Sequence, residues 1–378
     1  MSKRILIDAT NVNMLQPGGG TYCTKAYLEA FLALYPGQID VLHPQEAHIR
    51  DSRYTTIDVP GRSVTRAAFG ICKGYLHRAA ELIVRTIKQN PDKYDTLVIS
   101  TGLYAGGVLA QIKQYPIRTL ILHHNFEPEY RMDSASILTL RGKTDCFIRY
   151  WEKRGYLRAT INLFLTQYDL ELFEKEYGAH HHNYVTGIFE PTLERQQIEE
   201  KLAKESAVIT CALSDIQNQA PLLRFEQSYL PIFEEVLPDW HIELMGREPS
   251  QKIFEMASRH QCIHLTPDPE DIRTLAAQSK IYLCPMDAGG GLKLRIMDGL
   301  RAGQPILAHQ RATRGYDQLL NEPFFVSYHD ADSFRKGLLQ LVAYIQSNAY
   351  SKQKIQTLYY ESFGLEAGIK RLKAILCK

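Results

Sequence analysis

Short apolar segments alternate along the first half of the chain with longer segments in which apolar residues recur at helical spacing. The apolar segments predict buried strands at residues 4–9, 39–42, 96–99, 119–122 and 159–165. The periodic segments predict helices at residues 21–35, 64–89, 103–114, 141–157 and 167–177. This alternation indicates a parallel sheet that is covered by helices on both faces.

The same alternation restarts after a polar, charge-rich segment at residues 187–206. Further strands are predicted at residues 207–211, 242–246 and 263–265, and further helices at residues 219–236, 251–259, 269–278, 331–346 and 366–378. A chain of 378 residues is too long for one ordinary core. We therefore predict an α/β protein with two Rossmann-like domains, at residues 1–186 and 207–350, a linker at 187–206 and a helical C-terminal segment at 351–378.

Residues 281–309 contain the pattern with the most specific chemistry. An apolar strand is followed by a glycine triplet at 289–291, by a predicted helix with Lys293, Arg295 and Asp298, and by a second buried strand. Glycines let the backbone approach a ligand closely, and a helix N-terminus attracts anions. The alternative is a plain tight turn, which the two basic residues make less favourable.

A second glycine run, which includes Gly19 and Gly20, follows the first predicted strand. Its backbone N–H groups are suited to phosphate or sugar oxygens. The run lacks the G-x-G-x-x-G spacing of dinucleotide-binding proteins, which argues against a dehydrogenase. A plain turn is the alternative interpretation.

A polar cluster follows the predicted strand at residues 119–122 and consists of His123, His124, Asn125 and Glu127. Ligand sites of α/β proteins lie at the carboxyl ends of strands. His124 is therefore a candidate to bind a hydroxyl or phosphate group, with a structural histidine as the alternative. His123 is the weaker candidate of the two.

Composition agrees with a soluble globular protein, because 45% of the residues are hydrophobic and 23% are charged. The seven cysteines are dispersed, which favours reduced thiols over disulfides or a zinc site. We expect neither a secretory leader nor a membrane-spanning segment, because the apolar runs are too short for either. We expect a cytoplasmic protein with no nucleic-acid partner.

Three segments together resemble a known family. Residues 281–309, the HNxE pattern at 124–127 and the E-x6-A-x6-T-x2-D pattern within 149–178 resemble GT-B glycosyltransferases of the retaining family-4 type. The resemblance implies two Rossmann-like domains with an interdomain cleft, and a C-terminal helix that crosses back to the first domain. It also implies sugar transfer from a nucleotide diphosphate sugar to an acceptor hydroxyl, with retention of configuration and without a metal ion or other cofactor.

The resemblance also implies roles for individual residues. Lys293 and Arg295 would stabilise the departing diphosphate, and His124 would orient the donor sugar or the acceptor hydroxyl. The remaining donor-binding residues would be Gly289, Gly290, Gly291, Asp298, Gly19 and Gly20, and those on the acceptor side Asn125 and Glu127. Asp298 would bind the ribose, whereas Gly290 stands where the family has a carboxylate that holds the sugar.

Other functions and other motifs remain as alternatives. A non-hydrolysing nucleotide-sugar epimerase or an inactive nucleotide-binding protein would share this architecture. The basic residues within 62–88 favour either contact with an anionic membrane, which suits a lipid-linked saccharide acceptor in polysaccharide synthesis, or a solvated face. We interpret the histidines at 180–182 as a surface loop, and Thr166, Asp169, Asp330 and Asp332 as helix caps.

Overall fold

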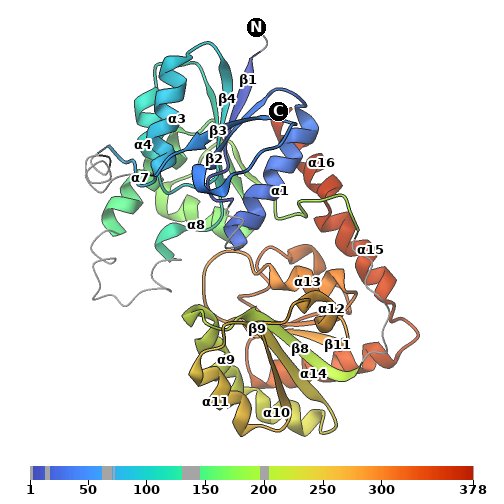
Figure 1. Cartoon of the computed structure of the whole chain (residues 1–378). Coiled ribbons are helices and arrows are strands. Elements are labelled where there is room, and N and C mark those ends of the chain that lie inside the picture. Colours follow the sequence, from blue (N-terminus) through green and yellow to red (C-terminus); the bar gives the residue numbers. More distant parts are fainter. Residues whose placement is uncertain are drawn as a thin grey trace. The chain divides into compact units, whose positions relative to one another are not determined.

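The structure is a computed structural model that describes residues 3–12, 18–61, 70, 73–129, 145–195 and 204–377. The chain forms two compact units (Figure 1). The N-terminal unit comprises Met1–Leu193 with Phe363–Lys378, and the C-terminal unit comprises Glu194–Ser362. The division after Leu193 lies within the predicted linker, and the return to the N-terminal unit lies within the predicted C-terminal segment.

The N-terminal unit contains a seven-stranded sheet in the order β3-β2-β1-β4-β5-β6-β7, with parallel pairing throughout. Its strands are β1 (Arg4–Asp8), β2 (Ile39–Pro44), β3 (Thr55–Val59), β4 (Tyr94–Ile99), β5 (Arg118–His123), β6 (Ile161–Phe164) and β7 (Asn183–Val185). Its helices are α1 (Gly19–Leu34), α3 (Arg78–Gln89), α4 (Ala105–Ile112), α7 (Asp145–Arg158), α8 (Gln167–Tyr177) and α16 (Leu365–Leu376). Helix α16 packs against α1 although the two are far apart in the sequence.

The C-terminal unit contains a six-stranded parallel sheet in the order β10-β9-β8-β11-β12-β13. Its strands are β8 (Lys204–Ala212), β9 (His241–Arg247), β10 (Ile263–Pro267), β11 (Ser279–Cys284), β12 (Ile306–His309) and β13 (Phe325–Tyr328). Its helices are α9 (Ile216–Ser228), α10 (Leu230–Val236), α11 (Gln251–Arg259), α12 (Ile272–Ala276), α13 (Arg295–Arg301), α14 (Ala331–Gln346) and α15 (Lys352–Phe363), of which α15 leads back to the N-terminal unit. The predicted α/β architecture with two parallel sheets is confirmed.

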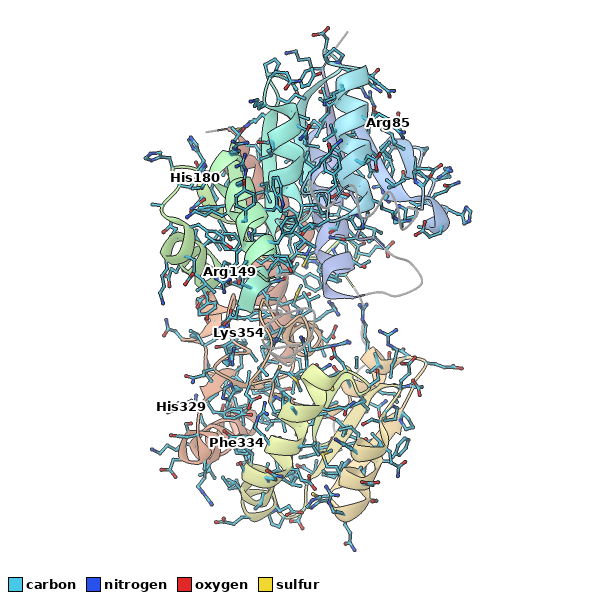
Figure 2. All side chains as sticks on the ribbon, turned by 90° about the vertical axis from the view of Figure 1, so that its left-hand side faces the viewer. Arg85, Arg149, His180, His329, Phe334 and Lys354 are labelled. Atoms are coloured by element: carbon cyan, nitrogen blue, oxygen red, sulfur yellow. The ribbon has the colours of Figure 1, made fainter. Side chains whose placement is uncertain are left out.

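The helix predicted at residues 64–89 is wrong at residues 73–77, which form a turn and extended backbone; of residues 64–72, all but Gly70 lie outside the described residues. Helix α3 begins only at Arg78, and His77 caps its N-terminus. Gly74 has a φ of 75°, and a Cβ there would lie 2.6 Å from the indole of Trp151. The chain therefore turns at Gly74 instead of continuing as a helix. Arg85 projects from α3 into solvent (Figure 2).

The single helix predicted at residues 219–236 is two helices, α9 and α10, that meet at Tyr229. Pro231 lies in the first turn of α10, where its missing N–H group costs no hydrogen bond. The first helix starts earlier than predicted, at Ile216, because Asp215 caps it by accepting a hydrogen bond from the backbone N–H of Gln217. In the described parts of the chain, none of the helices is both long and apolar enough to cross a bilayer.

Candidate functional site

In the sheet of the C-terminal unit, the strand order reverses between β8 and β11, which makes this pair the topological switch point. Strands β9 and β10 follow on one side, and β12 and β13 on the other. Ligands of open α/β sheets bind at the carboxyl ends of the strands at such a point. The glycine triplet follows β11, and the segment before α9 follows β8, so both lie at this edge.

The glycine triplet has a backbone that requires glycine at two positions. Gly289 has a φ of 83° and Gly291 a φ of 66°, in the left-handed region that other residues adopt rarely. A Cβ at Gly289 would also lie 2.8 Å from Nζ of Lys293. The loop is therefore shaped by glycine so that a cationic side chain can lie against its backbone.

Lys293 lies before the helix, not in its first turn as predicted. Helix α13 begins at Arg295, and the backbone carbonyl of Lys293 accepts a hydrogen bond of 2.9 Å from the hydroxyl of Tyr316. Its Nζ donates to the carbonyls of Gly289 at 3.0 Å and Gly290 at 3.4 Å. The ammonium group thus folds back onto the glycine loop, at the carboxyl edge of the sheet.

Asp298 faces three guanidinium groups, and these differ in their exposure. Arg301 donates to Asp298 at 2.8 Å with a side chain only 5% exposed, whereas Nη1 of Arg295 is 3.5 Å from the carboxylate and its side chain is 41% exposed. Arg273 lies farther away, at 4.0 Å. Arg301 is therefore a buried structural partner, whereas the side chains of Arg295 and Arg273, which are 41% and 47% exposed, can meet a ligand.

An ion pair holds the start of the glycine loop to helix α9. Nε of Arg224 donates to Asp287 at 2.6 Å, and Nη2 of Arg224 bonds the other carboxylate oxygen. A bidentate pair of this kind restricts both side chains in orientation. Their pairing was not predicted, because the two residues are 63 positions apart, although Asp287 lies within the segment 281–309.

In the sheet of the N-terminal unit, the strand order reverses between β1 and β4. Asp8, the last residue of β1, is fully buried and accepts hydrogen bonds from the hydroxyls of Thr10 at 2.6 Å, Ser100 at 3.1 Å and Tyr104. Its carboxylate therefore joins the ends of both central strands. Asp8 was not predicted to have a role, although its position as a carboxylate at the end of a buried strand is a usable signal.

His124 lies beside the first turn of α1. This helix begins at Gly19, two residues earlier than predicted, and a Cβ at Gly20 would lie 3.5 Å from Nδ1 of His124. The first N–H groups of a helix have no partner within it, so they are available to an anion or a hydroxyl. The predicted residues Gly19, Gly20 and His124 are thus neighbours.

Two polar atoms of the HNxE segment are shielded from solvent and have no hydrogen-bond partner among the residues that the structure describes: Nε2 of His124 and Nδ2 of Asn125. Such atoms are rare in folded proteins and often mark a ligand site. Burial, partly opposed by the charge of Asp8, lowers the pKa of His124 to about 4, so its imidazole is neutral near pH 7.

His123 has a structural role, in agreement with the prediction that it is a weaker candidate for ligand binding than His124. Its Nε2 lies 2.9 Å from Oδ1 of Asn162, and its ring stacks on Phe164 with 4.8 Å between centroids. Phe173 packs against the same ring at 4.5 Å. His123 therefore supports the end of β5 from within an aromatic core.

Glu127 is anchored through its backbone to a buried carboxyl group. Its N–H donates to Glu152 at 3.2 Å, and the hydroxyl of Tyr177 donates to the same side chain at 2.7 Å. Burial, with a contribution from Glu127, raises the pKa of Glu152 to about 8, so Glu152 is largely protonated at neutral pH. Sequence analysis missed this support for Glu127, although Glu152 opens the E-x6-A-x6-T-x2-D pattern.

Sequence comparison finds no matching family model and no significant match among curated proteins. Comparison with solved structures finds similarity over the whole chain. HepE of Anabaena, in complex with UDP and glucose, has 12% sequence identity and a TM-score of 0.65, with 100% of both chains covered. The chain has the GT-B fold.

Two other GT-B structures agree equally well. The sucrose-phosphate synthase of Thermosynechococcus elongatus has 12% identity and a TM-score of 0.66, with 99% of this chain and 98% of that chain covered. The lipopolysaccharide outer core galactosyltransferase WaaB has 10% identity and a TM-score of 0.65, with 99% of both chains covered. At these identities the similarity establishes the fold, and function has to be argued from the site.

In this chain with the GT-B fold, the predicted site residues lie at the carboxyl edges of the two sheets. Gly289, Gly290, Gly291, Lys293, Arg295 and Asp298 lie at the carboxyl edge of the C-terminal sheet, and Gly19, Gly20, His124, Asn125 and Glu127 at that of the N-terminal sheet. The interpretation of the remaining motifs as caps and a loop is confirmed for Thr166, Asp330 and the histidines, whereas Asp169 and Asp332 lie in the first turns of α8 and α14. Thr166 caps α8, Asp330 forms a capping box in α14, and the histidines at 180–182 lie on a loop, as the surface position of His180 illustrates (Figure 2).

Proposed function

We propose that the chain is a glycosyltransferase that moves a sugar from a nucleotide diphosphate sugar to an acceptor hydroxyl. The observation that carries this proposal is the position of Lys293, whose ammonium lies against the glycine loop at the carboxyl edge of the C-terminal sheet. Arg295, two residues later in the chain, presents a partly exposed guanidinium. The complex of HepE with UDP and glucose supports the choice of a nucleotide-sugar donor.

The chemical problem of the reaction is the departure of a nucleoside diphosphate. The bond between the anomeric carbon and the diphosphate oxygen breaks, and negative charge accumulates on that oxygen. The acceptor oxygen forms the new bond to the anomeric carbon, and the proton of the acceptor hydroxyl passes to the leaving diphosphate. Positive groups placed there in advance stabilise the charge without reorganisation. We assign this role to Lys293 and Arg295, with the backbone of the loop as further hydrogen-bond donors.

The N-terminal unit supplies neutral hydrogen-bonding groups. Because the pKa of His124 is lowered to about 4 by burial, its uncharged imidazole can exchange hydrogen bonds with a sugar or acceptor hydroxyl. Asn125 offers an amide beside it, and Glu127 is anchored through its backbone. We propose that these residues orient the donor sugar and the acceptor, and that the anomeric configuration is retained.

The acceptor in this proposal is a saccharide or a lipid-linked saccharide of a cell-surface polysaccharide or glycoconjugate. The solved structure of WaaB, a lipopolysaccharide outer core galactosyltransferase, supports this class. Arg85 and Lys88 are exposed on α3, and with the other basic residues of 62–88 they would contact the anionic inner face of the membrane. Two of these basic residues, Arg62 and Arg66, lie outside the described part of the chain.

The experiment that tests the proposal is a thermal-shift screen with UDP, GDP, ADP and TDP, followed by transfer assays with the sugars of the nucleotide that binds. We expect one nucleoside diphosphate to raise the Tm, since a ligand that binds the native state stabilises it. Transfer to an added acceptor supports the proposal. Binding without turnover would indicate an inactive binding protein, and a changed sugar without any acceptor would indicate an epimerase.

Transfer is expected to survive treatment with EDTA. In this proposal the charge of the leaving diphosphate is neutralised by Lys293 and Arg295, so no divalent ion is required. The measurement is the initial rate before and after dialysis against the chelator, with and without added Mg²⁺ or Mn²⁺. A rate that falls with EDTA and returns with the metal would contradict this part of the proposal.

A further inference from the structure

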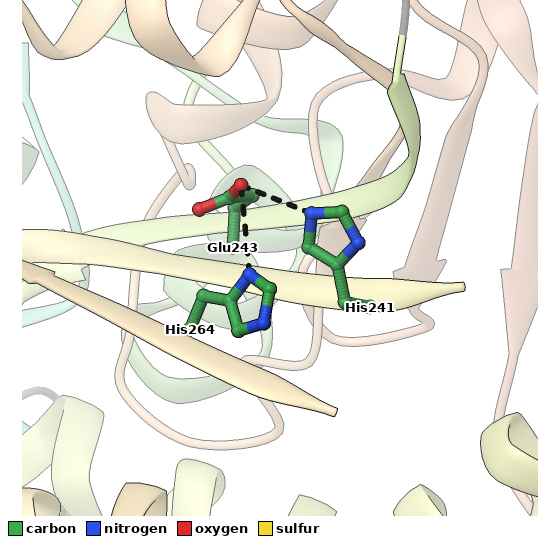
Figure 3. Close-up of side chains that lie close together, drawn as sticks. All are labelled: His241, Glu243 and His264. Carbon is green, nitrogen blue, oxygen red and sulfur yellow. Dashed lines mark hydrogen bonds and ion pairs between the residues drawn. The ribbon is translucent and has the colours of Figure 1, made fainter. Parts of the chain in front are cut away.

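Three potential metal ligands lie together on neighbouring strands of the C-terminal unit (Figure 3). His241 and Glu243 are two residues apart on β9, so their side chains point to the same face of the sheet. His264 on the edge strand β10 is in register with Glu243. The register of the two strands therefore brings two imidazoles and one carboxylate to one place.

The ligand atoms are close to the spacing that a single ion needs. Nε2 of His241 is 3.0 Å from Oε1 of Glu243, and Nδ1 of His264 is 4.0 Å from the same oxygen. All three ligand atoms lie within 4.8 Å of one another. Bonds of about 2.1 Å in a tetrahedral arrangement put ligand atoms about 3.4 Å apart. A small rotation of the histidine rings is enough to reach this spacing.

Burial gives the cluster one fixed ligand and one adjustable ligand. The side chain of Glu243 is only 10% exposed, whereas that of His264 is 55% exposed. The carboxylate is thus held in place, and His264 can turn toward an ion that arrives from solvent. Its exposure also leaves room for water in the remaining coordination positions.

One cation already lies near the carboxylate. Nζ of Lys204 is 3.6 Å from Oε1 of Glu243, and its side chain is 52% exposed. A long exposed lysine can withdraw into water at little cost. A dication that also bonds two imidazoles would therefore displace it.

We propose that His241, Glu243 and His264 form a binding site for Zn²⁺ or a similar transition-metal dication. Two imidazoles with one carboxylate suit such ions, whereas Mg²⁺ and Ca²⁺ prefer oxygen ligands. The site lies at the amino ends of β9 and β10, and the glycine loop with Lys293 lies at the carboxyl edge of the same sheet. A bound ion would link the edge strand β10 to β9, and its role is independent of sugar transfer.

The test is a titration of the metal-free full-length chain with Zn²⁺ against a competing chelator, together with Co²⁺ absorption spectroscopy. We expect one tightly bound equivalent of Zn²⁺, a visible Co²⁺ spectrum and a higher Tm with Zn²⁺. His264→Ala and His241→Ala should each weaken Zn²⁺ binding at least about tenfold. Lys204→Ala should tighten it, because the competing cation is removed.

Two controls make the result specific. His260 lies 3.0 Å from Glu226 in the same unit, so His260→Ala removes a histidine from a histidine–carboxylate pair outside the cluster. A double variant, His180→Ala with His182→Ala, removes two of the three histidines of the loop at 180–182. Both controls should keep full Zn²⁺ affinity. Unchanged affinity in His264→Ala, or loss in either control, would overturn the proposal, whereas chelation that abolishes transfer would bear on the proposed function instead.

Discussion

Replacing Lys293 with alanine is expected to lower the rate of sugar transfer by about 100- to 1,000-fold, the usual cost of removing one group that stabilises transition-state charge. The ammonium lies against the glycine loop, where the leaving diphosphate would develop its charge. The effect should fall mainly on kcat, since that charge is greatest in the transition state. The measurement is steady-state kinetics with the nucleotide sugar found in the thermal-shift screen.

Two further variants separate charge from structure at this position. Lys293→Arg keeps the positive charge but changes its shape, so it should retain more activity than Lys293→Ala. Lys252→Ala removes an exposed lysine from α11 and should match the native protein. Native rates in Lys293→Ala would refute the assignment of this residue to the diphosphate.

Replacing Asp298 with alanine is expected to reduce both nucleotide affinity and stability. A hydrogen bond to a charged group contributes about 1.5–3 kcal/mol, so loss of the ribose contact should weaken nucleoside diphosphate binding about tenfold or more. The change also removes the carboxylate partner of the buried Arg301, which should lower the free energy of unfolding by about 1–3 kcal/mol. Calorimetric titration and denaturant unfolding measure the two effects separately.

A matched variant distinguishes these two roles of Asp298. Arg301→Gln removes the structural half of the ion pair and leaves the carboxylate in place. It should lower stability but keep most of the nucleotide affinity. If Asp298→Ala binds the nucleoside diphosphate as tightly as the native protein does, the carboxylate has no ribose contact and serves only to hold Arg301.

The regular elements were largely predictable because their apolar residues follow the period of the structure they form. The buried strands β1, β4 and β5 were all predicted, whereas the edge strands β3, β7 and β13 were missed. The sequence of β3, Thr-Thr-Ile-Asp-Val, contains polar residues, and this edge strand is only partly buried. Edge strands need less apolar surface, so their signal in a sequence is weak.

The ends of helices were less predictable, because local signals compete there with contacts to distant residues. Nothing in the sequence near Gly74 indicates that the indole of Trp151 occupies the space beside it. Similarly, Lys293 has ordinary helix propensity, but its side chain bonds loop carbonyls before α13 begins. In both cases tertiary contacts decided where the helix starts.

For the candidate site, the sequence indicated which residues are suited to the proposed chemistry, through glycine runs, basic residues and the HNxE pattern beside predicted strands. It could not indicate the groups that hold them. Arg224 binds Asp287 across 63 positions, and Glu152 supports the backbone of Glu127 from another helix. Such partners lack a local pattern, because any pair of suitable side chains can meet once the strands are ordered.

The sequence by itself therefore determined the alternation of strands and helices, the need for glycine before α13 and the presence of positive charge beside it, since these depend on neighbours in the chain. Only the tertiary structure decided that Arg301 is the buried partner of Asp298, that burial keeps His124 neutral, and that His241, Glu243 and His264 meet on one face. Charge pairing and desolvation depend on distances in space, and the order of strands in a sheet sets those distances.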